Sequence, residues 1–364
     1  MTGLFNALLR PALFSLDAER AHALSIAALK SGMIRPLLRK PDPRLAVELA
    51  GHSFPSPIGM AAGYDKNAEV PDALLRLGFG FAEIGTVTPL VQEGNPKPRI
   101  FRLIEDQAVI NRFGFNSQGH EAVFQRLKER SGRPGIVGVN IGANKDSPNR
   151  IEDYVLGIRR FYPLASYFCV NISSPNTQGL RDLQARRSLA ELLIAIKLER
   201  ANGKARHKRT VPVFLKIAPD LSEEGLDDIA EEVAANGVDG VIVSNTTVSR
   251  NGLASEARTE AGGLSGAPLF ERSTIILAKM RQRVGPLMPL IGAGGVDSAG
   301  TALAKIEAGA DLVQLYTGMI YQGPGLAALI ARGLSEAVAR AGAKNIAEFR
   351  DRRLDEWADK AIPE

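Results

Sequence analysis

Short apolar runs recur along the chain from residue 57 to residue 316, separated by turns and by stretches with helical spacing of apolar positions. Most runs are rich in Val, Ile or Phe, as expected of strands buried on both faces of a parallel sheet. The eight runs are Pro57–Ala61, Phe81–Thr86, Ile136–Ile141, Tyr167–Asn171, Val213–Ile217, Gly240–Ser244, Leu290–Ala293 and Leu312–Tyr316. Helical patterns between them include Ala185–Arg200, Ser222–Asn236, Pro268–Val284 and Ser298–Ala308.

Eight alternating strand and helix units predict an α/β fold, a TIM (β/α)8 barrel. The rival is a doubly wound open sheet, which usually has fewer strands, so the count favours closure. We expect the barrel to occupy residues 44–364, after an N-terminal helical extension over residues 1–43. Three connections are long, and we expect them to cover a substrate: 87–135, 172–212 and 245–289.

The N-terminal segment is apolar but interrupted. Arg10 and Pro11 break the run within residues 1–16, and a membrane-spanning helix needs roughly 18–20 predominantly apolar residues. A secretory signal peptide carries Lys or Arg before its apolar run, and none precedes the run here. Within Ala18–Ser31 one helical face carries apolar side chains, and basic residues follow it: Ala21, Leu24, Ala28 and Leu29, then Arg35, Arg39 and Lys40. Such helices either lie in a bilayer interface or cover one end of the barrel.

Composition narrows the function. The 364 residues are 45% hydrophobic and 23% charged, which is typical of a globular chain. The 45 Lys and Arg exceed the 40 Asp and Glu by only five, and no basic block occurs, so we expect no nucleic-acid partner. One cysteine, Cys169, excludes intrachain disulfides. The four histidines do not have metal-ligand spacing, so we predict no metal site: His22, His52, His120 and His207.

Polar or glycine residues follow the predicted strands. In a TIM barrel the carboxyl ends of the strands carry the active site, so these residues are the candidates for chemistry. They are Asp65–Asn67, Thr86, Asn140, Asn171–Asn176, Lys216, Ser244–Thr247, Gly292–Gly295 and Tyr316–Gly318. Glycines after strands seven and eight let backbone N–H groups approach an anion, and these loops are the usual phosphate site of the fold. We therefore expect a phosphorylated cofactor or substrate.

Lys216 lies inside an otherwise apolar strand, where a buried cation is costly without a partner. Three interpretations are open: a charge facing a flavin, a Schiff-base lysine, or an internal ion pair with Asp220 or Asp239. Cys169 is two residues before Asn171 and therefore on the same side of its strand. We interpret Cys169 as a small buried side chain rather than a catalytic thiol.

The segment Asn171-Ile172-Ser173-Ser174-Pro175-Asn176-Thr177 resembles the dihydroorotate dehydrogenases, specifically the class 2, quinone-dependent type. The resemblance extends over nearly the whole chain, including the N-terminal helices. It also rests on Ala61–Asn67, Glu93–Arg99, Asn111–Asn116, Ser244–Thr246, Gly263–Gly266 and Gly292–Val296.

This resemblance implies an FMN enzyme that oxidises dihydroorotate to orotate in de novo pyrimidine (UMP) synthesis and is re-oxidised by a membrane quinone. Ser174 would be the catalytic base, where class 1 relatives have Cys. FMN contacts would come from Ala61, Ala62, Gly63, Tyr64, Asp65, Thr86, Asn140, Asn171, Lys216, Ser244, Gly266, Gly295, Tyr316 and Thr317. Substrate contacts would come from Lys66, Asn111, Arg112, Phe113, Gly114, Phe115, Asn171, Asn176, Asn245 and Thr246.

The same resemblance implies that the N-terminal extension forms a quinone tunnel beside FMN, lined by His22, Arg102 and Tyr316. The protein would then lie peripherally on the cytoplasmic side of the cell membrane, as a monomer without an obligate protein partner. One alternative is a soluble class 1 dehydrogenase that uses fumarate or nicotinamide; Ser174 and the extension argue against it. A second is a non-catalytic binder of a phosphorylated ligand, which would not bleach with dihydroorotate.

Overall fold

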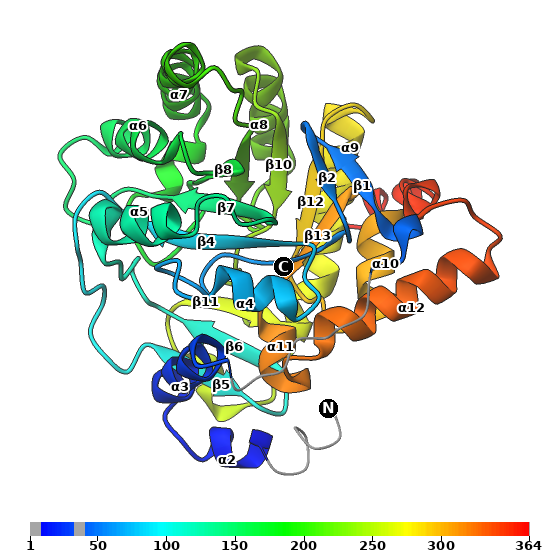
Figure 1. The fold of residues 1–364 in the computed structure, drawn as a ribbon. Helices are drawn as coiled ribbons and strands as arrows, with labels where there is room; N and C mark the ends of the chain where they lie inside the picture. Colours follow the sequence, from blue (N-terminus) through cyan, green and yellow to red (C-terminus); the bar gives the residue numbers. More distant parts are fainter. Residues whose placement is uncertain (1–8, 33–40, 364) are drawn as a thin grey trace.

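The computed structural model describes residues 9–32 and 41–363, and its centre is a closed barrel of eight parallel strands (Figure 1). The strands are β3 (Ile58–Met60), β4 (Phe81–Val87), β7 (Ile136–Ile141), β8 (Tyr167–Asn171), β9 (Val213–Ile217), β10 (Gly240–Val243), β12 (Leu290–Ala293) and β13 (Leu312–Leu315). Each strand pairs with its neighbours in chain order, and β13 pairs with β3 to close the ring. The predicted TIM barrel is confirmed, with each strand end within one residue of its prediction.

Helices surround the barrel and follow the strands in sequence (Figure 1). Their ends have clear local causes. Ser222 caps α8 by accepting a hydrogen bond from the N–H of Gly225, and Gly237 ends that helix in the left-handed region at φ 68°. The helices are α4 (Pro71–Arg76), α5 (Gly119–Glu129), α6 (Arg150–Phe161), α7 (Arg186–His207), α8 (Glu223–Asn236), α9 (Phe270–Val284), α10 (Ala299–Glu307), α11 (Thr317–Gln322), α12 (Leu326–Arg340) and α13 (Leu354–Ala358).

Aromatic side chains close the amino end of the barrel. A Cβ at Gly138 would lie 2.1 Å from the Tyr167 ring, so the glycine gives this ring its place inside the barrel. Tyr167 meets Phe81 and Phe214 edge-on, with ring centroids 6.3 and 5.4 Å away. Phe54 of the hairpin β1 (Val47–Leu49) and β2 (His52–Phe54) packs on Phe81 from below. These rings leave the carboxyl ends of the strands as the side on which a ligand can enter.

A second sheet, which the sequence analysis missed, lies over the carboxyl ends. It is antiparallel in the order β5 (Ile100–Leu103), β6 (Ala108–Asn111) and β11 (Gly263–Gly266). Its strands come from two of the long connections that were expected only to cover a substrate. The sheet has a small core of its own, formed by Leu103, Ala108, Ile110, Leu253 and Leu264. Four-residue strands brought together from distant segments give no clear period in sequence.

The N-terminal extension forms α2 (Arg10–Phe14) and α3 (Ala18–Lys30); α3 lies beside β5 and α4, and α2 packs on α3 (Figure 1). Asp17 caps α3 by accepting hydrogen bonds from the N–H groups of Glu19 and Arg20. Arg102 of β5 donates to the carbonyl of Leu13 at 2.9 Å, which ties the extension to the second sheet. Leu4, Phe5 and Leu8 of the apolar segment, and the basic residues Arg35, Arg39 and Lys40, lie outside the described residues.

Candidate active site

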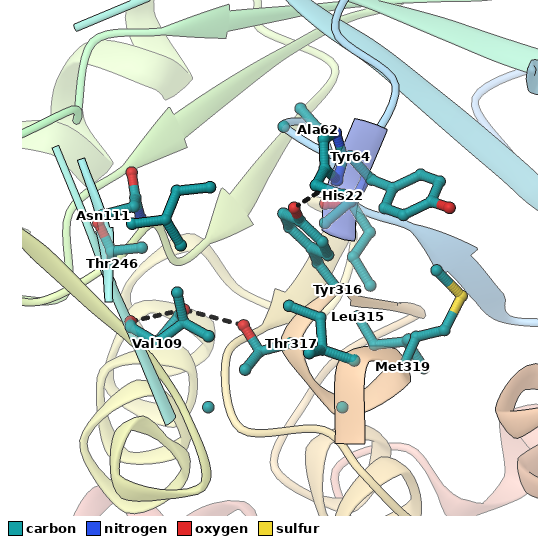
Figure 2. A pocket seen from close by; sticks show the side chains of 18 of the residues that line it. His22, Ala62, Tyr64, Val109, Asn111, Thr246, Leu315, Tyr316, Thr317 and Met319 are labelled. Atoms are coloured by element: carbon teal, nitrogen blue, oxygen red, sulfur yellow. Dashed lines mark hydrogen bonds between the residues drawn. The ribbon is translucent and has the colours of Figure 1, made fainter. Parts of the chain in front are cut away.

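A cavity of about 720 Å³ opens at the carboxyl ends of the barrel strands, between the rim, the second sheet and helices α2 and α3. Its volume is within the usual range for sites of small molecules and cofactors. Figure 2 shows its two sides: Asn111 and Thr246 lie on one, and His22, Tyr64 and Tyr316 face them from the other. The predicted helical face of α3 is confirmed, because Ala21, Leu24, Ala28 and Leu29 all line this cavity.

Most of the predicted site residues share this one cavity. Its lining includes Ala61, Ala62, Gly63, Tyr64, Thr86, Asn171, Lys216, Ser244, Gly266, Gly295, Tyr316 and Thr317 of the FMN set. It also includes Ser174 and, from the substrate set, Lys66, Asn111, Phe113, Gly114, Phe115, Asn176, Asn245 and Thr246. The three tunnel residues, His22, Arg102 and Tyr316, are part of the same lining. Three predicted residues are not: Asp65, Asn140 and Arg112.

Asp65 and Arg112 use their side chains to hold loops. Asp65 accepts hydrogen bonds from the N–H groups of Glu69 and Val70, at 2.8 and 2.9 Å, and burial raises its pKa to about 6. Arg112 forms an ion pair with Glu260 at 2.6 Å, away from the cavity. Direct contact of either side chain with a ligand is therefore not favoured, although the backbone of both residues lies next to lining residues.

A chain of hydrogen bonds runs from the cavity into the barrel. Asn245 donates to the side-chain oxygen of Asn171 at 3.2 Å, and Asn171 donates to the hydroxyl of Thr86 at 2.9 Å. Thr86 in turn donates to the amide oxygen of Asn140 at 2.6 Å. The amide nitrogen of Asn140 donates to Glu83 Oε1 at 2.8 Å. Asn140 therefore orients Thr86 from below the cavity.

Glu83 ends this chain and is a functional residue that the sequence analysis missed. It is fully buried in β4, and its Oε2 accepts from the hydroxyl of Tyr167 at 3.0 Å and from Gln314 Nε2 at 2.8 Å. With Asn140, three donors from three different strands meet one carboxylate. The available signal was a lone acidic residue in an apolar strand, the same signal that pointed to Lys216.

Lys216 lies in the cavity wall with only 5% of its surface exposed. The proposed ion pairs for it are wrong. Asp220 is paired with Arg181 at 2.9 Å, and Asp239 is paired with Arg200 at 2.8 Å. Within the described part of the chain no carboxylate lies within ion-pair distance of Lys216. Its charge is therefore available to an anionic or electron-rich ligand.

Cys169 is fully buried one layer below Asn171, as its place in the strand predicted. Its sulfur accepts a hydrogen bond from Asn140 at 3.0 Å. Burial, followed by the nearby carboxylate of Glu83, raises the pKa of the thiol well above its usual value. A protonated thiol outside the cavity lining agrees with a packing role.

Lys66 and Phe113 form a cationic wall of the cavity. Lys66 Nζ lies 3.1 Å from the centroid of the Phe113 ring and donates to Asn116 Oδ1 at 2.6 Å. Burial, and then the charge of Arg99, lowers the pKa of Lys66 well below its usual value. Arg99 is itself paired with Glu19 of α3 at 2.7 Å. A bound carboxylate would supply the counter-charge that Lys66 lacks.

Ser174 lies at the cavity surface and is 6% exposed. Its Oγ accepts from the N–H of Asn176 at 3.3 Å, and the Asn176 side chain donates to Asn111 Oδ1 at 3.3 Å. Three residues further on, the hydroxyl of Thr177 is buried and has no hydrogen-bond partner in the described part of the chain. The sequence analysis missed Thr177, although it lies within the motif that carries the resemblance.

The opposite arm of the cavity is aromatic (Figure 2). His22 meets Tyr64 edge-on at 5.2 Å, and its Nδ1 lies 3.4 Å from the hydroxyl of Tyr316. Burial, and then the charge of Lys66, lowers the pKa of His22 to about 4, so this imidazole is neutral near pH 7. Arg102 stacks over the Phe14 ring at 4.9 Å at the outer end. This arm is therefore apolar with a few fixed polar groups.

A further part of the cavity wall, called the glycine end below, is formed by glycines and hydroxyl groups: Gly294, Gly295, Ser265 and Thr317. Gly294 and Gly295 have φ values of 105° and 72°, which favour glycine, and a Cβ on Gly295 would lie 2.4 Å from the backbone of Phe270. Within the described residues the N–H groups of these two glycines have no hydrogen-bond partner. The hydroxyls of Ser265 and Thr317 lie 2.8 Å apart beside them. Such an end fits an oxyanion.

The fold and the site together define a class: a parallel β/α barrel whose cavity at the carboxyl rim has a glycine end that fits an oxyanion and a buried lysine in its wall. The sequence model of the family "Dihydroorotate dehydrogenase" matches residues 44–338. The chain belongs to the dihydroorotate dehydrogenase family.

Its relatives are similar over their whole length. Proteins named dihydroorotate dehydrogenase (quinone) from Brucella ovis and Brucella anthropi are 65% and 66% identical to this chain, with 100% of both chains covered in each case. Two solved structures of DHODH from Eimeria tenella, one ligand-free and one with ferulenol, are each 40% identical with a TM-score of 0.88. Each match covers 92% of this chain. It covers 99% of the ligand-free Eimeria chain and 95% of the chain in the ferulenol complex.

Proposed function

We propose that this protein oxidises dihydroorotate to orotate with FMN and passes the electrons to a membrane quinone, a step in pyrimidine (UMP) synthesis. One observation carries the proposal. A single cavity joins an anion-binding glycine end, a polar wall with a buried lysine and several asparagines, and an apolar arm lined by α2 and α3. Cofactor phosphate, substrate and quinone each need one of these environments. The family and the printed names of the relatives agree with the assignment.

The residues present fit FMN. In the described residues the N–H groups of Gly294 and Gly295 have no hydrogen-bond partner, and both glycines line the cavity, which suits a phosphate. Lys216 supplies an unpaired cation inside the cavity, and Thr86 and Asn171 supply oriented polar groups. FMN, when bound, would supply a two-electron acceptor between the substrate and the quinone. The side chains of Asp65 and Asn140 would act indirectly, by holding the surrounding loop and Thr86.

Substrate would be bound through its carboxylate and its ring amides. Lys66 is placed to pair with the carboxylate, which would restore the charge that burial disfavours. The asparagine side chains supply both donors and acceptors, which a ring of alternating carbonyl and N–H groups requires: Asn111, Asn171, Asn176 and Asn245. Because these amides also bond one another, the site is ordered before substrate arrives.

Ser174 would take the proton from the substrate carbon at its Oγ. A serine hydroxyl is a weak base and must hand a proton onward as it receives one. The hydroxyl of Thr177, three residues further along the chain, is buried and has no hydrogen-bond partner in the described residues, and it is the group we assign to the relay. The N–H of Asn176 holds the Ser174 oxygen in place.

The quinone would enter through the arm between α2 and α3, where His22, Tyr316 and Arg102 are the polar groups. Leu9, Leu16 and Leu24 are exposed on this extension, which supports peripheral contact with a lipid surface. The side we propose is the cytoplasmic face of the cell membrane. In residues 9–32 and 41–363, no helix is both long and apolar enough to cross a bilayer. We propose that residues 1–43 act as this membrane and tunnel unit and that the protein works as a monomer.

The purified protein provides a direct test. We expect it to be yellow with FMN, to bleach when dihydroorotate is added without oxygen, and to regain colour with a short-chain quinone. Fumarate and nicotinamide should not restore the colour; if one of them does and quinone does not, a class 1 activity replaces this proposal. A colourless protein, or a yellow one that dihydroorotate does not bleach, would refute it.

A further inference from the structure

A lysine is buried behind the glycine end of the cavity. Lys305 of α10 has no exposed surface, and burial lowers its pKa well below the usual value. Its Nζ donates to the hydroxyl of Ser273 at 2.6 Å, and in the described part of the chain no carboxylate pairs with it. A buried cation with one neutral partner is costly, and an apolar side chain of similar volume would pack more stably there.

Neighbouring residues make room for this lysine. A Cβ on Gly292 of β12 would lie 3.3 Å from Cδ of Lys305, so the glycine leaves space for the lysine stem. The Phe270 ring lies 5.3 Å from Nζ. A lysine therefore occupies a shaped site in which an apolar side chain would be more stable, and we look for its role in the adjacent cavity.

Ser273 connects the lysine to the glycine end. Its hydroxyl accepts from Lys305, which leaves its own proton to donate, and two carbonyls lie 3.1 Å away: those of Phe270 and Gly294. The carbonyl of Phe270 already accepts from the Thr274 hydroxyl at 2.6 Å. The Ser273 proton is therefore directed to the carbonyl of Gly294.

Fixing that carbonyl also fixes the N–H on the other side of the same peptide. Because a trans peptide places its C=O and N–H in opposite directions, the Gly295 N–H points away from Ser273. Gly294 and Gly295 both line the cavity, and the Gly295 N–H has no partner in the described residues. The glycine conformation alone does not choose this orientation, because glycine adopts several.

We propose that Lys305 and Ser273 are positioning residues that aim the Gly294–Gly295 peptide at the phosphate of the bound cofactor. Lys305 polarises the Ser273 hydroxyl, Ser273 holds the Gly294 carbonyl, and the Gly295 N–H then donates to a phosphate oxygen. The charge of the phosphate in turn compensates the buried ammonium through this chain. The inference rests on the proposed FMN function and adds to it the residues that select a phosphorylated flavin.

The test compares two flavins that differ only in the phosphate. Cofactor-free protein is titrated with FMN and with riboflavin, and binding is followed by flavin fluorescence. Lys305→Met and Ser273→Ala should each lower the FMN-to-riboflavin affinity ratio about tenfold, the effect of one charge-assisted hydrogen bond, with riboflavin affinity unchanged. The matched control is Lys279→Met, which makes the same exchange at a lysine of α9 that pairs with Glu223 at 2.8 Å and does not line the cavity; it should leave the ratio unchanged.

The melting temperature of the cofactor-free protein is a second measurement, which distinguishes a positioning role of Lys305 from a role in packing. Lys305→Met should melt at the same temperature as the cofactor-free wild type or higher, because it removes a buried cation. An FMN-to-riboflavin affinity ratio within twofold of the wild-type ratio in Lys305→Met and Ser273→Ala overturns the inference. So does an equal loss of affinity for FMN and for riboflavin. If the wild type itself binds FMN no better than riboflavin, the proposed FMN function fails as well. If it prefers FMN and the variants keep that preference, only this inference fails.

Discussion

Glu83→Gln tests whether the carboxylate below the cavity organises the residues above it. In the structure Glu83 accepts three hydrogen bonds, from Asn140, Tyr167 and Gln314. A glutamine has one acceptor oxygen, so its amide nitrogen must face at least one of the present donors. Asn140 can relieve the conflict by turning its amide over. Its nitrogen would then face Thr86, which would lose its acceptor.

Two effects of opposite sign determine the magnitude. Removing a buried carboxylate avoids a desolvation cost of several kcal/mol, which favours the variant. Against this, three bonds to a charged acceptor at about 1.5–3 kcal/mol each are replaced by neutral ones near 1 kcal/mol, and a donor left unpaired costs about 1–3 kcal/mol more. Because the carboxylate is fully satisfied in the folded protein, we expect a net loss of about 1–3 kcal/mol.

Urea unfolding at pH 7 measures this loss, and a titration with FMN measures the effect on the site. Tyr167→Phe is the matched control, because it removes one of the three bonds without freeing Asn140. It should lose about 1 kcal/mol of stability and keep FMN affinity, whereas Glu83→Gln should weaken FMN binding as Thr86 loses its orientation. A Glu83→Gln variant that is as stable as wild type and binds FMN equally well would refute the role given to this carboxylate.

Three further results are expected. Ser174→Ala should lose most turnover and keep its FMN affinity, since the hydroxyl takes the substrate proton; an unchanged kcat contradicts this. Burial lowers the pKa of His120 from 6.5 to about 4, so on acidification this group takes up its proton in the unfolded chain first, and its own contribution should lower stability by about 2 kcal/mol from pH 7.5 to 5. His120→Leu should flatten that part of the curve in urea unfolding; parallel curves argue against it. Deleting residues 1–40 should abolish quinone reduction but spare FMN binding and reduction of a water-soluble dye, and quinone kinetics that survive would rule out the tunnel.

The barrel was predictable because its strands are buried on both faces. Such strands are continuous apolar runs, and eight of them in regular alternation with helices leave few other topologies. The second sheet was not predictable in this way. Its strands have four residues each, and although β5 and β6 form a hairpin, β11 pairs with β6 from more than 150 residues away; strands so short, paired over that distance, leave no local period.

The candidate site likewise has residues that the sequence located by position and residues that it did not. The residues at the strand ends, from Thr86 to Thr317, could be found by position alone, because a closed parallel barrel brings all carboxyl ends to one rim. The resemblance supplied the substrate and the tunnel residues. Lys216 stood out as an isolated charge in an apolar strand, but the sequence did not show which partner it would have; Glu83 gave the same signal and was missed.

The sequence by itself determined the barrel, its open end and the polar side chains at the strand ends, because these follow from local periodicity and from the fixed direction of each strand. Only the tertiary structure decided which charges are paired. Asp220 lies beside Arg181 rather than Lys216, and Lys305, eleven residues further along the chain than Gly294, lies behind it in α10. Those pairings depend on distances between elements, which periodicity does not contain, and they separate the polar groups that hold the fold together from those left free for a ligand.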